Sequence, residues 1–265
     1  PGKCRNCSTK RMWLAGNSGP FRVHNLEVES PSASGLRILH ISDLHFAPGQ
    51  KAKQQFLKEL ADLKPDLVIN TGDNLGHKDA INPTLRALEP LLEFPGVFVN
   101  GSNDYRAPKP RNPIRYFTGP SKVQAGQALD TDRFMRELVG AGWQDINNKS
   151  ARLEIRGKSL GFMGLDDPHD HLDDLESLGQ QAVEIANADL RIGVAHAPYM
   201  RVIDAFLENQ AALMFAGHTH GGQICLPGQK ALVTNCDLPT EFASGLSAWS
   251  NDQQEAMLHV SNGLG

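Results

Sequence analysis

Cysteine, long apolar runs and excess positive charge are all scarce in this sequence of 265 residues. Its four cysteines are too few to build a disulfide scaffold. No apolar run approaches the ~20 residues that a membrane-spanning helix needs, so we expect no transmembrane segment. Lys and Arg number 26 and Asp and Glu 30, which leaves a net charge of −4 and no basic field to hold nucleic acid. With 40% hydrophobic residues, the composition is that of an ordinary globular protein rather than a disordered or fibrous one.

The two ends of the sequence carry little structural information. Residues 1–20 show no periodicity and lack the apolar core of a signal peptide, so they are predicted to be a tail without a fold. Residues 21–265 are predicted to form a single domain, and the turn-like end Asn262–Gly265 leaves open a truncation at the C-terminus. Nothing in these residues directs export, although a trimmed N-terminus could have carried a signal or an anchor. We therefore expect the protein to be cytoplasmic or peripheral at the membrane.

Cys4 and Cys7 form a Cys-x-x-Cys pair that could be half of a zinc ribbon. The other two cysteines, Cys225 and Cys236, lie eleven positions apart, whereas a ribbon needs a second close pair. The negative net charge also disfavours a nucleic-acid binder of this kind. An accidental pair in a loose tail is the favoured interpretation.

Strand-like and helix-like segments alternate along the chain. Short runs rich in branched residues predict strands, and apolar residues at helical spacing predict helices. The predicted strands are 36–41, 66–70, 96–100, 151–156, 158–164, 190–195, 211–216, 223–226, 231–234 and 256–260. The predicted helices are 51–63, 83–92, 131–140, 172–187 and 199–208, and prolines make 106–120 an irregular excursion. Alternation with short connections indicates a parallel α/β layer.

Acids, amides and histidines follow five of these strands. They are Asp43 and His45, then Asp73, then the run Gly101-Ser102-Asn103-Asp104, then His196, and last His218 with His220. In an open α/β sheet such strand ends gather at one edge, where ligands bind. We therefore expect these side chains to form one cluster.

The chemistry of this predicted cluster favours a transition-metal centre. Two carboxylates and four imidazoles form a mixed oxygen and nitrogen set, which suits Mn, Fe, Co, Ni or Zn better than a calcium cage of oxygens. The set contains no cysteine, which argues against a closed structural zinc site.

The motif blocks resemble those of the calcineurin-like metallophosphoesterases, in the same order over roughly residues 36–225. The wording Ile41-Ser42-Asp43-Leu44-His45 and Ala216-Gly217-His218-Thr219-His220-Gly221-Gly222-Gln223 is similar to the bacterial phosphohydrolase branch, which includes enzymes that cleave lipid-linked UDP-sugar pyrophosphate. The resemblance implies two packed mixed β-sheets flanked by helices, a four-layer αββα architecture. It also implies two divalent metal ions and a phosphorylated small molecule or lipid-linked substrate, with peripheral membrane contact possible.

By the same resemblance, each of the six side chains has an implied role. Asp43, His45 and His220 would hold the first metal, Asp73 would bridge both, and His196 and His218 would hold the second. The family's remaining ligand is the Asn of a Gly-Asn-His-Asp/Glu block, but here Ser102 occupies that position and Asn103 the position of the catalytic His. Either the Ser102 hydroxyl or, after a shift of one residue, the Asn103 amide would complete the second site.

The expected reaction is hydrolysis of phosphate esters or anhydrides, with a hydroxide between two metals attacking phosphorus in line. Because Asn103 cannot donate a proton as an acid, the expected substrate is a phosphodiester or pyrophosphate whose leaving group needs little protonation. His169 is a second candidate acid, and Arg106 and Arg111 are candidate clamps for substrate phosphate. The alternative is a catalytically silent, metal-binding relative that recognises a phosphorylated ligand.

Overall fold

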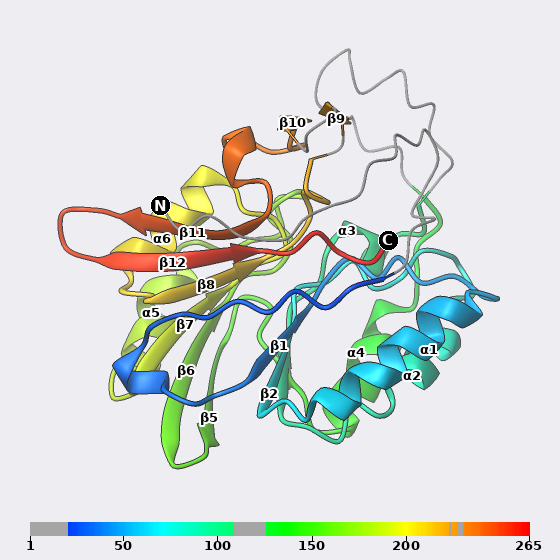
Figure 1. Ribbon diagram of the computed structural model, residues 1–265, viewed down its shortest axis with the longest axis horizontal. Helices are drawn as coiled ribbons and strands as arrows, with labels where there is room; N and C mark the ends of the chain where they lie inside the picture. Colours follow the sequence, from blue (N-terminus) through cyan, green and yellow to red (C-terminus); the bar gives the residue numbers. More distant parts are fainter. Residues whose placement is uncertain (1–20, 109–125, 223, 227–229) are drawn as a thin grey trace.

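The computed structural model describes residues 21–108, 126–222, 224–226 and 230–265. Within them the chain folds into two large β-sheets (Figure 1). The first has four strands in chain order, all parallel: β1 (Ile38–Ile41), β2 (Leu67–Asn70), β3 (Gly96–Phe98) and β4 (Gln144–Asp145). The predicted parallel layer is thus confirmed.

The second sheet has six strands in the order β11-β12-β8-β7-β6-β5. Their bounds are β5 (Ser150–Ile155), β6 (Lys158–Gly164), β7 (Leu190–Val194), β8 (Leu213–Ala216), β11 (Gly245–Ser250) and β12 (Glu255–Val260). The four inner strands are mutually parallel, and the two edge strands run antiparallel to their neighbours. A separate hairpin pairs β9 (Ile224–Leu226) with β10 (Lys230–Val233).

Helices cover the outer faces of both sheets (Figure 1). The four-stranded sheet is covered by α1 (Lys51–Glu59), α2 (Ile81–Leu88) and α4 (Thr131–Gly140), and the six-stranded sheet by α5 (Ser177–Glu184) and α6 (Met200–Glu208). The short α3 (Ser102–Tyr105) stands at the strand ends, close to the last described residues. Short 3-10 turns lie at Pro31–Ala33, Leu60–Leu63 and Thr240–Phe242.

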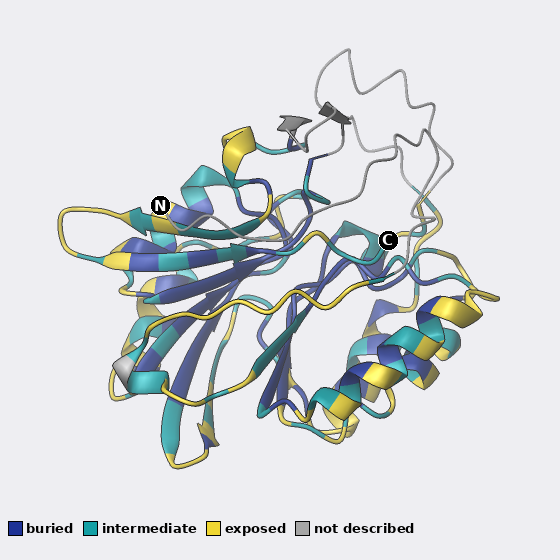
Figure 2. Ribbon diagram, in the orientation of Figure 1, coloured by how far each residue is buried: buried dark blue, intermediate teal, exposed yellow. Residues whose placement is uncertain are grey.

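Three apolar clusters join these four layers. One lies between the first sheet and its helices and includes Val68 and Phe134, and a second lies between the other sheet and its helices and includes Met214 and Phe206. The third lies between the sheets, where residues such as Ile69 meet the side chains of the six-stranded sheet. Figure 2 shows the strands buried and the helices exposed on their outer surfaces. The predicted αββα architecture is confirmed, with the difference that only the six-stranded sheet is mixed.

Several elements differ from the sequence-based prediction, among them β4 and α3, which are too short to carry a periodic pattern and were not expected. Strand β11 was not expected, because an edge strand that is half-exposed and contains Gly245 and Ser247 carries no continuous apolar pattern. Helix α5 is shorter than 172–187, since the Asp173 carboxylate is paired with Arg201 and the Asp174 carbonyl accepts the N–H of Ser177. The predicted tail at 1–20 and most of the excursion at 106–120 lie outside the described residues.

Candidate metal centre

The six side chains predicted as ligands lie at the carboxyl ends of strands from both sheets. Asp43 and His45 follow β1, Asp73 follows β2, His196 follows β7, and His218 and His220 follow β8. Backbone hydrogen bonds between the two chain segments continue beyond the ends of β1 and β2. The N–H groups of Asp43 and His45 donate to the carbonyls of Gly72 and Asp73 at 2.8 and 2.9 Å. This pairing fixes the first two blocks side by side.

Five of these residues share an uncommon backbone conformation. All have positive φ: 49° at Asp43, 37° at His45, 55° at Asp73, 69° at His218 and 52° at His220. Non-glycine residues in this region cost roughly 1–3 kcal/mol each and persist where the surroundings impose them, often at functional sites. The fold therefore holds the side chains in this arrangement at a cost in stability.

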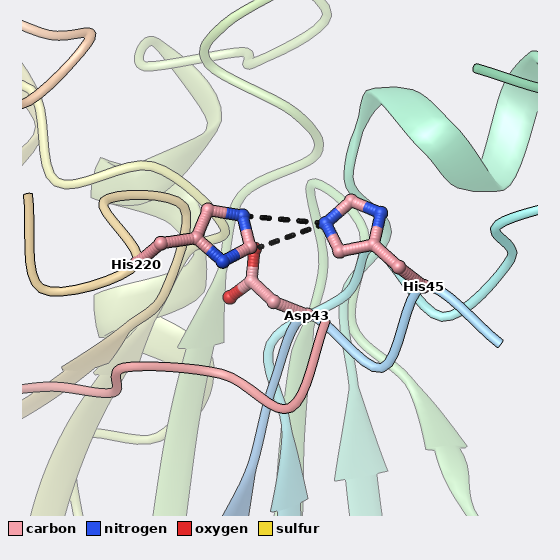
Figure 3. Close-up of side chains that lie close together, drawn as sticks. All are labelled: Asp43, His45 and His220. Carbon is pink, nitrogen blue, oxygen red and sulfur yellow. Dashed lines mark hydrogen bonds and ion pairs between the residues drawn. The ribbon is translucent and has the colours of Figure 1, made fainter. Parts of the chain in front are cut away.

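Asp43, His45 and His220 form a first cluster (Figure 3). Asp43 Oδ1 lies 3.4 Å from His220 Nε2 and 3.8 Å from His45 Nε2, and the two Nε2 atoms are 3.3 Å apart. Donor atoms around one ion with bonds of ~2.0–2.2 Å are separated by distances of this size. The three side chains point toward one common centre.

Asp43, Asp73 and His196 form a second cluster that shares Asp43 with the first. Asp73 Oδ2 lies 3.5 Å from His196 Nε2 and also 3.5 Å from His45 Nε2. One carboxylate oxygen thus stands between an imidazole of each cluster.

The Asp43 carboxylate provides a test of whether a cation fits here. Its Oδ2 accepts hydrogen bonds from the Ser42 hydroxyl and the His218 N–H, at 2.5 and 3.0 Å. Its Oδ1 is buried and has no hydrogen-bond partner among the described residues. Burial is the largest influence and raises the pKa of Asp43, but the neighbouring His220, His196 and His45 together bring it below its usual value, so the carboxyl favours its charged form. A buried oxygen that faces two imidazole nitrogens fits a divalent metal ion.

His196 is oriented through its other ring nitrogen. Nδ1 lies 2.7 Å from the Thr71 carbonyl, which can only accept, so Nδ1 carries a proton and Nε2 is the ring atom that faces Asp73. Burial lowers the pKa of His196, but Asp73 and Asp43 raise it well above its usual value, so without a metal Nε2 also carries a proton that a bound ion would replace. Metal-binding histidines are commonly fixed by such a hydrogen bond to a backbone carbonyl.

His218 approaches the second cluster with Nδ1, which lies 3.3 Å from His196 Nε2. Its Nε2 lies 3.4 Å from the carbonyl of Asn235. Burial, followed by the neighbouring His196 and His169, lowers the pKa of His218 to about 3. The ring therefore stays neutral and can offer Nδ1 as a ligand atom.

Helix α3 brings Asn103, rather than Ser102, to the Asp73 carboxylate. The backbone N–H of Asn103 donates to Asp73 Oδ1 at 2.8 Å, and its side-chain amide lies 2.6 Å from Asp73 Oδ2. The Ser102 hydroxyl makes no hydrogen bond with any described residue. Asp104 anchors the helix, because its buried carboxylate accepts the N–H groups of Asn74, Leu75 and Gly101.

The other predicted residues fall in different places. The His169 ring lies against His218, with 4.6 Å between ring centroids, so it borders the cluster. Arg106 is exposed just after α3, and Arg111 lies outside the described residues. Sequence reasoning missed Tyr199, whose hydroxyl lies 3.0 Å from His169 Nδ1. The sequence signal that could have identified Tyr199 was its position three residues after His196.

The end of the described chain also borders the site, which no local pattern foretold. The backbone N–H of Leu264 donates to the Asp43 carbonyl at 3.1 Å. A side chain at Gly265 would collide with the His45 ring, so the backbone passes directly against this imidazole.

Comparisons with known proteins identify the family of this chain. A family model described as calcineurin-like phosphoesterase matches residues 36–222. An uncharacterized metallophosphoesterase of Aquifex aeolicus is 26% identical, over 80% of this chain and 74% of that protein. YkoQ, an uncharacterized metallophosphoesterase of Bacillus subtilis, is 24% identical, over 82% of this chain and 74% of its own length. A zebrafish transmembrane protein with a metallophosphoesterase domain is 22% identical, and the match covers 95% of this chain and 54% of the zebrafish protein.

No helix among the residues described here is long and apolar enough to cross a membrane.

Two solved structures share the fold at low identity. TT1561 of Thermus thermophilus superposes with a TM-score of 0.50 at 14% identity, over 86% of this chain and 90% of that one. A purple acid phosphatase from yellow lupin gives a TM-score of 0.50 at 13% identity, over 87% of this chain and 44% of the phosphatase. With the family match and the clustered blocks, the assignment follows: this chain belongs to the calcineurin-like phosphoesterase family, whose members are metal-dependent hydrolases of phosphorylated substrates.

Proposed function

We propose that the chain is a dinuclear metal-dependent hydrolase that prefers phosphodiester or pyrophosphate bonds. The observation that carries this proposal is the position of Asp73 Oδ2, which lies 3.5 Å from His45 Nε2 of one cluster and 3.5 Å from His196 Nε2 of the other. A carboxylate in this position would serve both metals as a bridging ligand.

Each predicted ligand has a role in this proposal. Asp43, His45 and His220 hold the first ion with Asp73, and His196 and His218 hold the second with Asp73. The amide of Asn103 completes the second site, since its side chain lies on Asp73 whereas the Ser102 hydroxyl is bonded to no described residue. The mixed oxygen and nitrogen donor set suits Mn, Fe, Zn, Co or Ni.

When bound, two divalent ions would polarise the phosphoryl oxygens and lower the pKa of a water molecule between them. The chain supplies only two carboxylates among the proposed ligands, so the loaded site keeps a positive charge. That charge favours an anionic substrate even though the net charge of the protein is −4.

The preference for diesters and pyrophosphates follows from the proton donors that are available. The Asn103 amide stands where an acid is expected in this family and cannot protonate a leaving oxygen. His169, beside His218, is the candidate donor, and Arg106 and Arg111 are candidate contacts for substrate phosphate. A lipid-linked pyrophosphate reached by peripheral membrane contact remains within this proposal.

The test is metal content by elemental analysis after purification without chelator, together with hydrolysis of bis(p-nitrophenyl) phosphate. We expect two metals per chain and turnover that EDTA abolishes and Mn²⁺ restores. Asp73→Asn should lose both metals or most turnover, because it alters the ligand common to the two sites. One metal per chain with no turnover on adding Mn²⁺ would contradict the proposal.

The departure at Ser102 and Asn103 supports a second candidate, a metal-binding relative that recognises a phosphorylated ligand without cleaving it. Calorimetry with inorganic phosphate and a non-hydrolysable phosphonate diester separates the two. Tight binding without turnover of any diester would favour the silent binder, and turnover would eliminate it.

A further inference from the structure

The loop that carries His169 is built around a buried carboxylate. Asp167 is fully buried, and its side chain accepts the backbone N–H groups of His169 and Asp170 at 3.1 and 3.2 Å. Its carbonyl accepts the N–H of Leu172 at 2.9 Å. The turn before and after His169 is therefore defined by hydrogen bonds within the loop itself.

A second set of contacts ties this loop to helix α6. The Arg201 guanidinium pairs with both carboxylate oxygens of Asp173, whose side chain is 2% exposed. The same guanidinium donates to the Pro168 carbonyl at 3.0 Å. Arg201 therefore clamps the loop on both sides of His169.

The His169 ring itself is held between two side chains. Its Nδ1 lies 3.0 Å from the Tyr199 hydroxyl, and its ring borders His218 at a centroid distance of 4.6 Å. The Arg201 guanidinium in turn lies 5.5 Å from the centroid of the Tyr199 ring. The tyrosine thus links the clamp to the imidazole.

The direction of the Tyr199 hydrogen bond decides which nitrogen of His169 carries the proton. Burial raises the pKa of Tyr199 to about 12, so the hydroxyl keeps its proton, and at 3.0 Å it is placed either to donate to Nδ1 or to accept from it. A neutral imidazole that accepts at Nδ1 carries its N–H on Nε2. Donation by the tyrosine would therefore leave the ring proton on Nε2.

We propose that Tyr199 is a positioning residue, which holds His169 with its N–H on Nε2 so that the imidazole donates a hydrogen bond to the leaving oxygen of the substrate. This inference rests on the proposed hydrolase function and adds to it the element that orients the donor. Arg201 supports the same arrangement by fixing the loop backbone.

The first test needs no turnover. In metal-free protein labelled with ¹⁵N-histidine, the His169 signals, identified by their loss in His169→Gln, should show Nδ1 as acceptor and Nε2 as N–H. Tyr199→Phe keeps the ring beside Arg201 and removes only the hydroxyl, so it should shift the ring toward a mixture of tautomers. Tyr105→Phe is the matched control, because its hydroxyl bonds Asp166 in the same loop without touching His169. An unchanged His169 tautomer in Tyr199→Phe would overturn the inference.

The second test compares leaving groups in the metal-loaded protein. With methyl phenyl phosphate, His169→Gln should reduce kcat by ~10²-fold or more and Tyr199→Phe by ~10-fold, whereas methyl p-nitrophenyl phosphate should lose only a few-fold because nitrophenolate needs little help. The double variant should be no slower than His169→Gln alone, since Tyr199 acts through His169.

The two failures are distinguishable. If the metal-loaded wild type hydrolysed neither diester, the proposed function would be wrong and this inference would fall with it. If the wild type hydrolysed both and Tyr199→Phe slowed them equally or not at all, only the assignment of Tyr199 would fail.

Discussion

Asn103 contacts Asp73 twice, through a backbone N–H 2.8 Å from Oδ1 and a side-chain amide 2.6 Å from Oδ2. The oxygen and nitrogen of an amide are assigned from hydrogen bonding, so a 180° turn of the side chain would place the amide oxygen at the same spot. With a cation next to Asp73, that orientation would be the favourable one. The contact therefore links the unusual Gly101-Ser102-Asn103-Asp104 block to the proposed second metal site.

The first prediction separates the two candidate ligands of this block. Asn103→Ala should weaken the second metal by ~10–100-fold in affinity, because it removes the amide beside the bridging carboxylate. Ser102→Ala is the matched control and should leave both metals bound. Isothermal titration calorimetry with the metal measures the affinities of both variants. If Ser102→Ala lost the second metal and Asn103→Ala kept it, the Ser102 hydroxyl would be the ligand.

A second prediction concerns the acid missing from this block. The double variant Ser102→Asn with Asn103→His restores the Gly-Asn-His-Asp order of the family, and it should raise kcat on alkyl phosphodiesters by ~10²-fold while changing nitrophenyl esters little. Kinetics on the two substrate types provide the measurement. An equal effect on both would show that protonation of the leaving group is not what limits this chain.

The clustering of the six acidic and histidine side chains could be predicted from the sequence because their signal is local. Each follows a strand, and parallel strands bring their carboxyl ends to one edge whatever the details of packing. The spacing of Asp43 with His45, and of His218 with His220, is likewise visible without a structure. The fold class followed from the same alternation and from the resemblance that the blocks carry.

Which of Ser102 and Asn103 contacts Asp73 could not be predicted, because it depends on where a four-residue helix begins. Such a helix is too short for any periodic pattern, and its orientation comes from Asp104, which accepts N–H groups of a loop thirty residues away. Tyr199 and Leu264 reach the site only through tertiary packing. Contacts between distant segments leave no pattern in a single sequence.

The third prediction uses the close approach of Gly101 to the site. A β-carbon at this position would overlap Asp73 Oδ1 and lie 2.8 Å from ring atoms of His196, so Gly101→Ala should displace the Asp73 carboxylate. A misplacement of ~1 Å can cost ~10²-fold in rate. We expect metal loading and turnover to fall together in elemental analysis and diester assays.

Gly179 supplies the control for this substitution. It lies in α5, where an added β-carbon would meet no atom within 4 Å, so Gly179→Ala should keep full activity and stabilise the helix by ~0.5–1 kcal/mol. Full metal loading in Gly101→Ala would show that the carboxylate can shift without loss of the site.

The fourth prediction concerns stability with and without metal. Saturation at ~100 times Kd should stabilise the wild type by ~2.7 kcal/mol, which corresponds to a rise in Tm of ~5–10 °C for a domain of this size. Asp43→Asn removes charge at the carboxylate shared by both clusters and should abolish most of this rise. Differential scanning fluorimetry with EDTA or Mn²⁺ measures it, and the Tm in EDTA verifies that the variant folds. An equal rise in both proteins would exclude Asp43 as a ligand.

The last prediction concerns Lys53, a lysine on α1 that is only 5% exposed and donates to the Leu44 carbonyl at 2.6 Å. Burial lowers the pKa of Lys53 to about 8, against ~10.4 in the unfolded chain. Between these values the unfolded state binds more protons than the native state, so the free energy of unfolding rises with pH by up to ~1.4 kcal/mol per unit. The stability contributed by neutral Lys53 is thus present at high pH and is lost as the pH falls through about 8. Urea unfolding in EDTA at pH 7.5 and 9.5 should show the wild type gaining ~2 kcal/mol relative to Lys53→Met. Lys51→Met is the control: Lys51 is exposed, so the free energy of unfolding of this variant should differ from that of the wild type by a small amount that is the same at both pH values. If the difference between wild type and Lys53→Met were also the same at both pH values, the Lys53 amine would be charged in the folded protein at pH 7.5 and at pH 9.5.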